Sequence, residues 1–130
     1  MKITLPLSAL RAMIHTSSDG DIRYYLNGVH VIATKTHSRL ESTNGHYCGI
    51  FVYETDDNEV EGLIDFIVPL DEVKMLKPSK SLDVLTIEYD AATKTGTLNV
   101  LAGMSVRFTA IDGKFPDLER VMPKTATSGV

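Results

Sequence analysis

Ile3–Leu7 (ITLPL), followed by Leu10–Arg11, recurs later in the chain as Phe66–Leu70 (FIVPL), followed by Val73–Lys74. The offset of 63 residues is about half of the 130-residue chain, so the repeat predicts two similar supersecondary units related by a pseudo-twofold axis. In each copy a short strand runs into a proline. Proline suits the first turn of a helix, where its missing N–H would have had no helical partner. We therefore expect each unit to begin with a strand and a helix.

Apolar residues return at helical spacing after both prolines, which predicts two amphipathic helices. Pro78 is expected to end the second helix. The apolar stripes comprise Leu7, Leu10 and Met13 or Ile14 in the first helix, and Leu70, Val73 and Leu76 in the second.

Three runs rich in β-branched and aromatic residues follow each helix and are typical of strands. Asn44–Gly45 suits a tight hairpin, Asp90–Gly96 is a polar connector, and Thr55–Gly62 is an acidic loop between the halves. The order β-α-β-β-β, present twice, predicts an α+β fold with two helices packed on antiparallel sheets. The expected strands are Arg23–Ala33, Ser38–Thr43, Tyr47–Tyr53, Val84–Tyr89, Thr97–Leu101 and Ser105–Ile111.

Length and composition indicate one globular domain, which we expect to span residues 1–124 and to be followed by a flexible tail at residues 125–130. The single cysteine, Cys48, excludes an internal disulfide, and the N-terminus lacks the pattern of a secretory signal. A reducing cytoplasm is therefore expected. No apolar run approaches the length that crosses a bilayer, so membrane insertion is not expected.

The residues give little support for catalysis. His46 and Cys48 share a strand face, but no second ligand pair has zinc-like spacing. Asp56–Glu59 is too short for a calcium loop, and no phosphate-binding glycine loop or nucleophile elbow is present. We therefore expect no catalytic residues, no metal and no cofactor, and a protein that is not an enzyme.

The least generic string is Asp21–Gly28 (DIRYYLNG). From its residues alone it reads as a strand entering a turn at Asn27–Gly28. Together with Ser42–Tyr47 (STNGHY) and Asp112–Pro123 (DGKFPDLERVMP), however, it resembles, in the same order, segments of the middle domain of the bacterial sliding clamp, the beta subunit of DNA polymerase III. The likeness runs from about residue 2 to residue 124 and covers one of the three domains of a full clamp.

This resemblance implies a DNA-clamp fold, whose complete rings hold six such domains with helices facing the DNA. It also implies a pocket into which partner proteins insert a short linear peptide. An apolar floor with a few polar groups suits such a peptide. A plainer alternative is that Pro116 and Val121 only tie down the C-terminal segment. The positions of this chain that correspond to the family's pocket are Leu26, Thr43, Gly45, His46, Tyr47, Pro116, Arg120 and Val121.

Three positions depart from the family's Thr-Asp-Gly-His-Arg-Leu string, where this chain has Asn44, Tyr47 and Cys48. Tyrosine in place of arginine removes a fixed positive charge but keeps a flat contact surface, so peptide preference could differ. The other wall of the family's pocket comes from a third domain, which this chain lacks. Half of the groove must come from another subunit or be absent.

Contact with DNA is the less supported expectation. A net charge of -4 argues against binding through bulk positive charge, although a ring needs only a mildly basic inner face. Where the family often has a basic pair after the second proline, this chain has Leu70–Asp71. Basic residues on an amphipathic helix are usually only a solvated face. The candidate DNA-facing residues are Arg11, Tyr24, Tyr25, Lys74, Lys77 and Lys80.

Two functions follow from the resemblance. The first is a DNA replication accessory protein, a processivity factor or scaffold that binds peptides of polymerase or other replication proteins and self-associates around double-stranded DNA. Edge strands at Tyr47–Tyr53 and Ser105–Ile111 would join the copies. The second is a monomeric peptide-binding clamp mimic or regulator, of phage or mobile-element origin, that does not encircle DNA.

Overall fold

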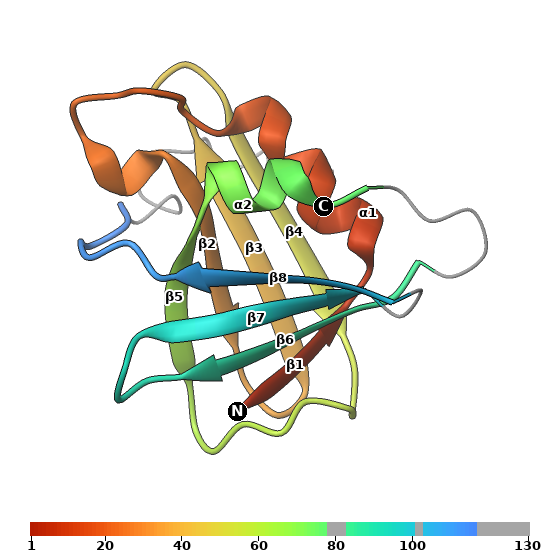
Figure 1. Ribbon diagram of the computed structural model, residues 1–130. Coiled ribbons are helices and arrows are strands. Elements are labelled where there is room, and N and C mark those ends of the chain that lie inside the picture. Colours follow the sequence, from red (N-terminus) through yellow and green to blue (C-terminus); the bar gives the residue numbers. More distant parts are fainter. Residues whose placement is uncertain (78–82, 101–102, 117–130) are drawn as a thin grey trace.

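The structure, a computed structural model, describes residues 1–77, 83–100 and 103–116. Its strands and helices are named in Figure 1. The expected tail at residues 125–130 lies outside the described residues. The elements are β1 (Lys2–Leu5), α1 (Leu7–Ala12), η1 (Met13–Thr16), η2 (Tyr24–Leu26), β2 (Gly28–Ala33), β3 (His37–Thr43), β4 (Cys48–Glu54), β5 (Ile64–Pro69), α2 (Leu70–Met75), β6 (Leu85–Asp90), β7 (Thr95–Val100) and β8 (Met104–Thr109).

Eight strands form two antiparallel four-stranded sheets, the first in the order β1-β6-β7-β8 and the second in the order β4-β3-β2-β5. The strands of the two sheets cross, and α1 and α2 lie together along one end of the pair (Figure 1). The predicted α+β architecture is confirmed. Each half of the chain contributes the order β-α-β-β-β, as the repeat predicted, and the first half adds the 3-10 helices η1 and η2.

The first strand of each half joins the sheet of the other half. β1 pairs with β6, with Ile3 opposite Ile87, and β5 pairs with β2, with Val68 opposite Val29. The two sheet orders are therefore equivalent when the halves are exchanged. Because each sheet needs both halves, the two repeats form one folding unit.

Pro6 and Pro69 are the residues immediately before α1 and α2, so both helices start at the predicted prolines, whereas the predicted stop at Pro78 lies outside the described residues. Leu7 and Leu10 of α1 and Val73 of α2 are buried in the main core, and Leu70 of α2 is also buried. Leu76 is also buried but already has extended backbone, so α2 ends before it. The helices are short and are stabilised by this buried face, because isolated helices of such length are unstable in water.

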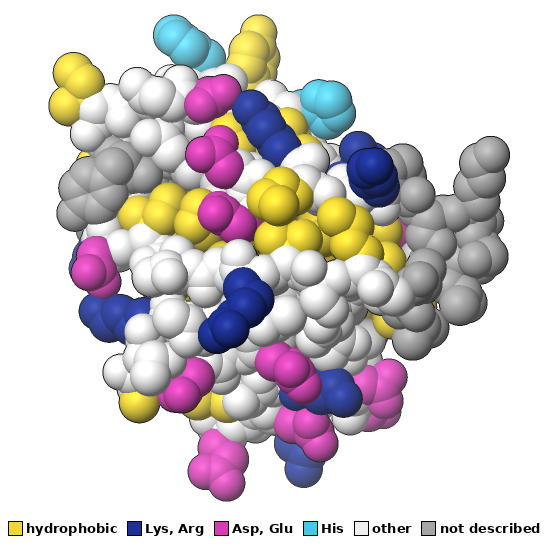
Figure 2. Space-filling view, viewed as in Figure 1, with side chains coloured by type: hydrophobic (Ala, Val, Ile, Leu, Met, Phe, Trp, Pro, Cys, Tyr) yellow, Lys and Arg dark blue, Asp and Glu magenta, His cyan; other side chains and the backbone are white. Residues whose placement is uncertain are grey.

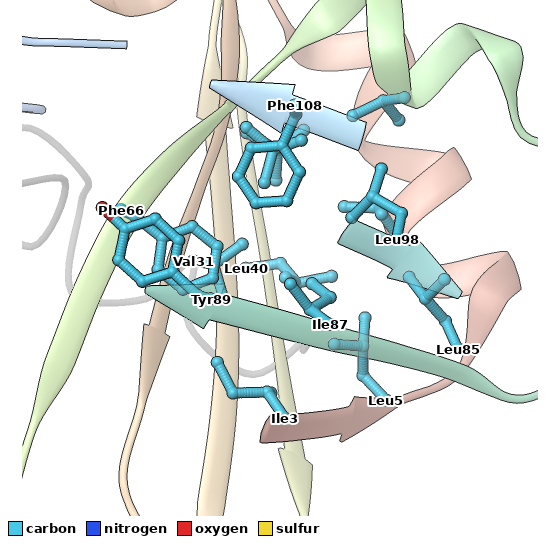
Figure 3. Packing of buried hydrophobic residues seen from close by; sticks show 14 of the residues in the cluster. Ile3, Leu5, Val31, Leu40, Phe66, Leu85, Ile87, Tyr89, Leu98 and Phe108 are labelled. Atoms are coloured by element: carbon cyan, nitrogen blue, oxygen red, sulfur yellow. The ribbon is translucent and has the colours of Figure 1, made fainter. Parts of the chain in front are cut away.

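The main core lies between the sheets (Figure 3). Phe66 of β5 stacks on Tyr89 of β6 with ring centroids 4.1 Å apart, and Phe108 of β8 lies 5.9 Å from Phe66. Gly96 of β7 leaves room for this stack, because a Cβ at this position would lie 2.6 Å from the Phe108 ring. The aromatic stack joins strands of both sheets.

The predicted strand Arg23–Ala33 is wrong over its first residues. The Asn27 side chain accepts a hydrogen bond from the Asp21 N–H and donates one to the Asp21 carbonyl, both 3.0 Å long. These bonds close a loop, within which the Leu26 N–H donates to the Arg23 carbonyl in a 3-10 turn. Side chains that bond the local backbone in this way compete with a sheet ladder. The strand therefore begins at Gly28.

Candidate functional site

A second, smaller hydrophobic cluster lies on the outer face of the second sheet, and we call it the outer cluster. Leu26, Ile67 and Phe115 are its buried members. Ile67 follows Phe66 in β5 and so points away from the main core, because successive side chains of a strand alternate between faces. Tyr25, Cys48, Ile50 and Ile111 pack against these residues and are only partly buried. The outer cluster therefore presents apolar surface to solvent.

The β3–β4 hairpin is held by Thr43 and Asn44. The Thr43 hydroxyl donates to the Tyr47 carbonyl at 3.0 Å and accepts the Gly45 N–H at 3.2 Å. The Asn44 side-chain oxygen accepts the N–H groups of His46 and Tyr47 at 2.9 Å each. These bonds use up the polar groups of Thr43 and leave the side chains of His46 and Tyr47 exposed, Tyr47 by 70%.

The loop before β2 is fastened to this hairpin. The Ser18 N–H donates to the Leu26 carbonyl and the Ser18 hydroxyl donates to the Thr43 carbonyl. Arg23 lies so near Gly45 that a Cβ there would be 3.2 Å from its guanidinium. Arg23 is also paired with Asp21, and this pairing lowers the pKa of the Asp21 carboxyl. Leu26, Thr43 and Gly45 are thus fixed relative to one another.

Residues 111–116 cross the outer face of the second sheet and complete the cluster. The Ile111 N–H donates to the Ile67 carbonyl at 3.0 Å, and Phe115 packs with Ile67 and Leu26. Pro116 follows and is half-buried. A hollow of about 420 Å³ adjoins Phe115 and Pro116. Of the predicted peptide-binding residues, Leu26 belongs to the outer cluster, Thr43, Gly45, His46 and Tyr47 form the adjoining hairpin, and Pro116 lies beside Phe115, whereas Arg120 and Val121 lie outside the described residues.

A charged group beneath the outer cluster was missed by the sequence analysis. His30 lies between two carboxylates, with Nδ1 2.9 Å from Glu41 and Nε2 3.0 Å from Asp65. Arg39 pairs with the second oxygen of Glu41 at 2.9 Å. In the sequence His30 was seen only as one of several scattered histidines. Strand alternation places His30, Glu41 and Asp65 on outward faces, but only the strand register shows that they meet.

The candidate DNA-facing residues are not all brought together. Arg11 and Lys74 lie on the two helices, where Arg11 donates to the Leu76 carbonyl and Lys74 pairs with Asp19. Lys77 is exposed just after α2. Tyr25 instead packs against the outer cluster. Lys80 and the side chain of Tyr24 lie outside the described part.

The helix face carries a band of hydrophobic side chains with acidic and basic groups scattered along it (Figure 2). α2 carries Asp71 and Glu72 in its first turn and Lys74 in its last turn. Among the described residues of the face shown, acidic and basic groups are therefore mixed and form no continuous basic stripe.

Within the described ranges, no three His, Cys, Asp or Glu side chains are grouped so that they could hold a metal ion. None of the helices found there is long and apolar enough to cross a membrane.

Comparison with known proteins finds no matching family model but clear relatives among individual proteins. The beta sliding clamp of Pseudomonas putida is 30% identical over 129 residues, which are 92% of this chain and 33% of the relative. That of Proteus mirabilis is 28% identical over 140 residues, 100% of this chain and 36% of the relative. The chain is homologous to a single domain of the beta sliding clamp. It matches about one third of the length of these relatives, which corresponds to a single clamp domain.

Solved clamp structures have the same fold as this chain. The DNA polymerase III beta subunit of Pseudomonas aeruginosa superposes with a TM-score of 0.77 and 22% identity over 95% of this chain and 35% of that one. The beta subunit of Thermotoga maritima gives 0.76 and 21% over 95% and 34%. A Pseudomonas aeruginosa clamp bound to griselimycin gives 0.74 and 22% over 95% and 34%. The beta sliding clamp family is non-catalytic, in agreement with the expectation that the chain is not an enzyme.

Proposed function

We propose that this clamp-family domain is a DNA replication accessory protein of the cytoplasm that binds short linear peptides of polymerase or other replication proteins at the outer cluster. The observation that carries the proposal is the partly exposed apolar surface of Cys48, Ile50 and Tyr25 beside a rigid hairpin. Apolar peptide side chains gain by leaving water on such a surface, and nearby polar groups orient the peptide backbone. A related clamp whose structure holds griselimycin adds support.

The floor of this site would be Leu26, Ile50 and Phe115, with Pro116 beside them. The polar rim would be His46 and Tyr47, because Thr43 is already occupied by the hairpin. Tyr47 presents an aromatic ring and a hydroxyl at the position where the sliding-clamp string has arginine. We therefore expect a weaker preference for acidic peptides than an arginine would give. Arg120 and Val121 remain part of the proposed site.

The test is a fluorescence anisotropy titration with a labelled peptide that carries Leu and Phe anchors. We expect saturable binding by the wild type. Ile50→Glu, which places a charge in the outer cluster, should abolish binding, and Tyr47→Ala should weaken it. The control is Leu63→Ala. Leu63 is 65% exposed and lies just before β5, at the end of the second sheet that is away from the β3–β4 hairpin. The proposal fails if the wild type does not bind, or if Ile50→Glu binds normally while remaining folded.

Self-association around double-stranded DNA is the second candidate function. The observation that favours it is the position of β4 and β8, each of which is the outermost strand of its sheet. An unpaired strand edge can pair with a second copy, and pairing of one copy's β4 with the next copy's β8 would join domains head to tail. The chain matches about one third of the length of each relative. Several copies would therefore have to join in this way to build a ring from this domain.

The alternative is a monomeric peptide-binding clamp mimic. The mixed charge of the helix face favours it over DNA encirclement, since Arg11 and Lys74, two of the three described basic candidates, already have partners within the chain. Light scattering after gel filtration separates the two. A mass that rises with protein concentration supports association, and a constant monomer mass at high concentration excludes the ring.

A further inference from the structure

The imidazole of His30 is enclosed by charged and aromatic groups. Its side chain is 11% exposed and that of Glu41 is 6% exposed, whereas that of Asp65 is 61% exposed. The ring of Phe115 stacks on the imidazole with centroids 4.9 Å apart and planes inclined by 26°. His30 is therefore held at both nitrogens in its own plane and covered on one face by Phe115.

The number of protons on His30 determines how many of these bonds form. An ionised carboxylate can only accept hydrogen bonds, and a neutral imidazole has only one N–H. Both contacts, at 2.9 and 3.0 Å, are thus hydrogen bonds when the ring carries two protons. When one proton is lost, a nitrogen lone pair faces a carboxylate oxygen, and one charge-assisted bond is replaced by repulsion.

His30 is coupled to the proposed peptide site through the strand register and through Phe115. Ile67, His30, Glu41 and Ile50 lie opposite one another in a row across four strands, so the charged pair lies between two apolar members of the outer cluster. Phe115 contacts His30 on one side and belongs to the same cluster as Leu26 on the other. Phe115 therefore connects His30 directly to the floor of the proposed peptide site.

We propose that doubly protonated His30 is a positioning residue for peptide binding: it holds Phe115 in place on the outer cluster, and peptide affinity falls as rising pH removes one of its protons. The inference rests on the proposed peptide-binding function and adds to it a residue and a pH dependence. His30 touches no peptide itself and acts through Phe115.

The other charged groups around His30 do not remove this dependence. Arg39 is paired with Glu41, so this carboxylate is shared, and Lys94 is paired with Asp112 at 2.7 Å. Of the two carboxylates that contact His30, Asp65 is the more exposed to solvent, so its interaction with the imidazole is the weaker one. The titratable and charged groups that line the hollows beside His30 are Arg39 and Glu41 from β3, Asp65 from β5, Tyr89 and Lys94 from β6 and the turn after it, and Asp112 and Lys114 from the C-terminal segment.

The first experiment measures affinity for the labelled Leu- and Phe-containing peptide between pH 5.5 and 8.5. We expect wild-type affinity to fall about three- to tenfold, the effect of losing one hydrogen bond. His30→Gln, which has one side-chain donor group and does not titrate, should give a flat profile at the weak, high-pH level. Asp65→Asn should reduce the pH dependence. His37→Ala, a control that removes an exposed histidine at the far end of β3, should keep the full profile.

A wild-type affinity that does not change with pH, or a profile that persists in His30→Gln, overturns the inference but leaves peptide binding intact. Absence of binding at every pH instead contradicts the proposed function. For that case, an NMR titration of the full chain without peptide follows the ring protons of His30 and Phe115. We expect the Phe115 signals to shift together with those of His30, and constant Phe115 signals through the His30 titration overturn the inference.

Discussion

Replacing Gly96 with alanine tests whether the aromatic stack between the sheets needs a bare backbone at this position. The added methyl carbon would lie 2.5 Å from the Glu88 carbonyl oxygen and 2.6 Å from the Phe108 ring, whereas ordinary contacts begin at 3.4 Å. The neighbours would have to move by about 0.8 to 0.9 Å, the difference between these distances. β7 is bonded to β6 and β8 on both sides, so its backbone has little freedom to shift.

The magnitude follows from two opposing terms. Overpacking of this kind costs about 1–3 kcal/mol, while alanine in place of glycine restricts the unfolded chain and returns about 0.4–1 kcal/mol. We expect Gly96→Ala to destabilise the fold by about 1–2 kcal/mol, or a few degrees in Tm. Urea unfolding followed by circular dichroism measures this difference. Thr97→Ala, on the outer face of the same strand, is the control and should change stability by less than about 0.5 kcal/mol.

A double-variant cycle identifies the clash. Phe108→Leu removes the ring that the new methyl group would meet, so Gly96→Ala should cost less in that background by about 0.5–1 kcal/mol. The clash with the Glu88 carbonyl remains, and recovery should be incomplete. If Gly96→Ala is as stable as the wild type, or if the two substitutions are simply additive, the packing argument is refuted.

Three further predictions concern polar groups. Asn58 is buried, and its side chain accepts the Thr4 N–H and donates to the carbonyls of Thr34 and His37 and to the Ser38 hydroxyl. Asn58→Ala should lower the free energy of unfolding by about 2–4 kcal/mol, because several buried groups lose their partner. Urea unfolding measures this change. Burial raises the pKa of Tyr89 above its usual 10.0, so the unfolded chain loses this proton at lower pH than the folded chain does. The contribution of Tyr89 to folding stability is therefore complete below pH 10 and declines above it. Tyr89→Phe should lose less stability than the wild type as pH rises above 10. The hydrogen bonds from Arg23 lower the pKa of Asp21 below 3.8. The loop closed by Asp21 should therefore persist above this pH and open only as pH falls through the lower pKa that Asp21 has in the folded protein. An NMR titration of the carboxylates measures this pKa, and an unshifted Asp21 would contradict the prediction.

Much of the fold could be predicted because local signals agreed with one another. The two proline-led helices and most strands coincide with runs whose spacing and residue types indicated them. The exchange of β1 and β5 between sheets could not be predicted, because hydrophobic alternation shows which face a strand buries but not which strand lies beside it. Arg23–Asn27 looked like strand because of its two tyrosines. The side chains of Asp21 and Asn27 instead form hydrogen bonds with the local backbone, which close a loop in place of a strand.

The candidate site was predictable only in part, for a similar reason. Motif resemblance indicated Leu26 and the Thr43 hairpin, which are fastened together, and Pro116, which follows Phe115 of the outer cluster. The contributions of Ile67 and Phe115 were not visible, because they depend on a strand and a terminal segment from the other half of the chain. His30 was missed since its partners Glu41 and Asp65 are 11 and 35 residues away in sequence.

The origin of the outer cluster links binding to folding. Leu26, Cys48 and Ile50 come from the first half of the chain, whereas Ile67, Ile111 and Phe115 come from the second. These two groups meet because β5 leaves the sheet of its own half and pairs with β2. A binding surface made in this way cannot form on either half alone, because removing β5 would take away Ile67 and the carbonyl that anchors Ile111. The exchange of strands that makes the two repeats one folding unit is thus also what assembles the proposed peptide site, and ligand binding should stabilise the whole domain and not a local part of it.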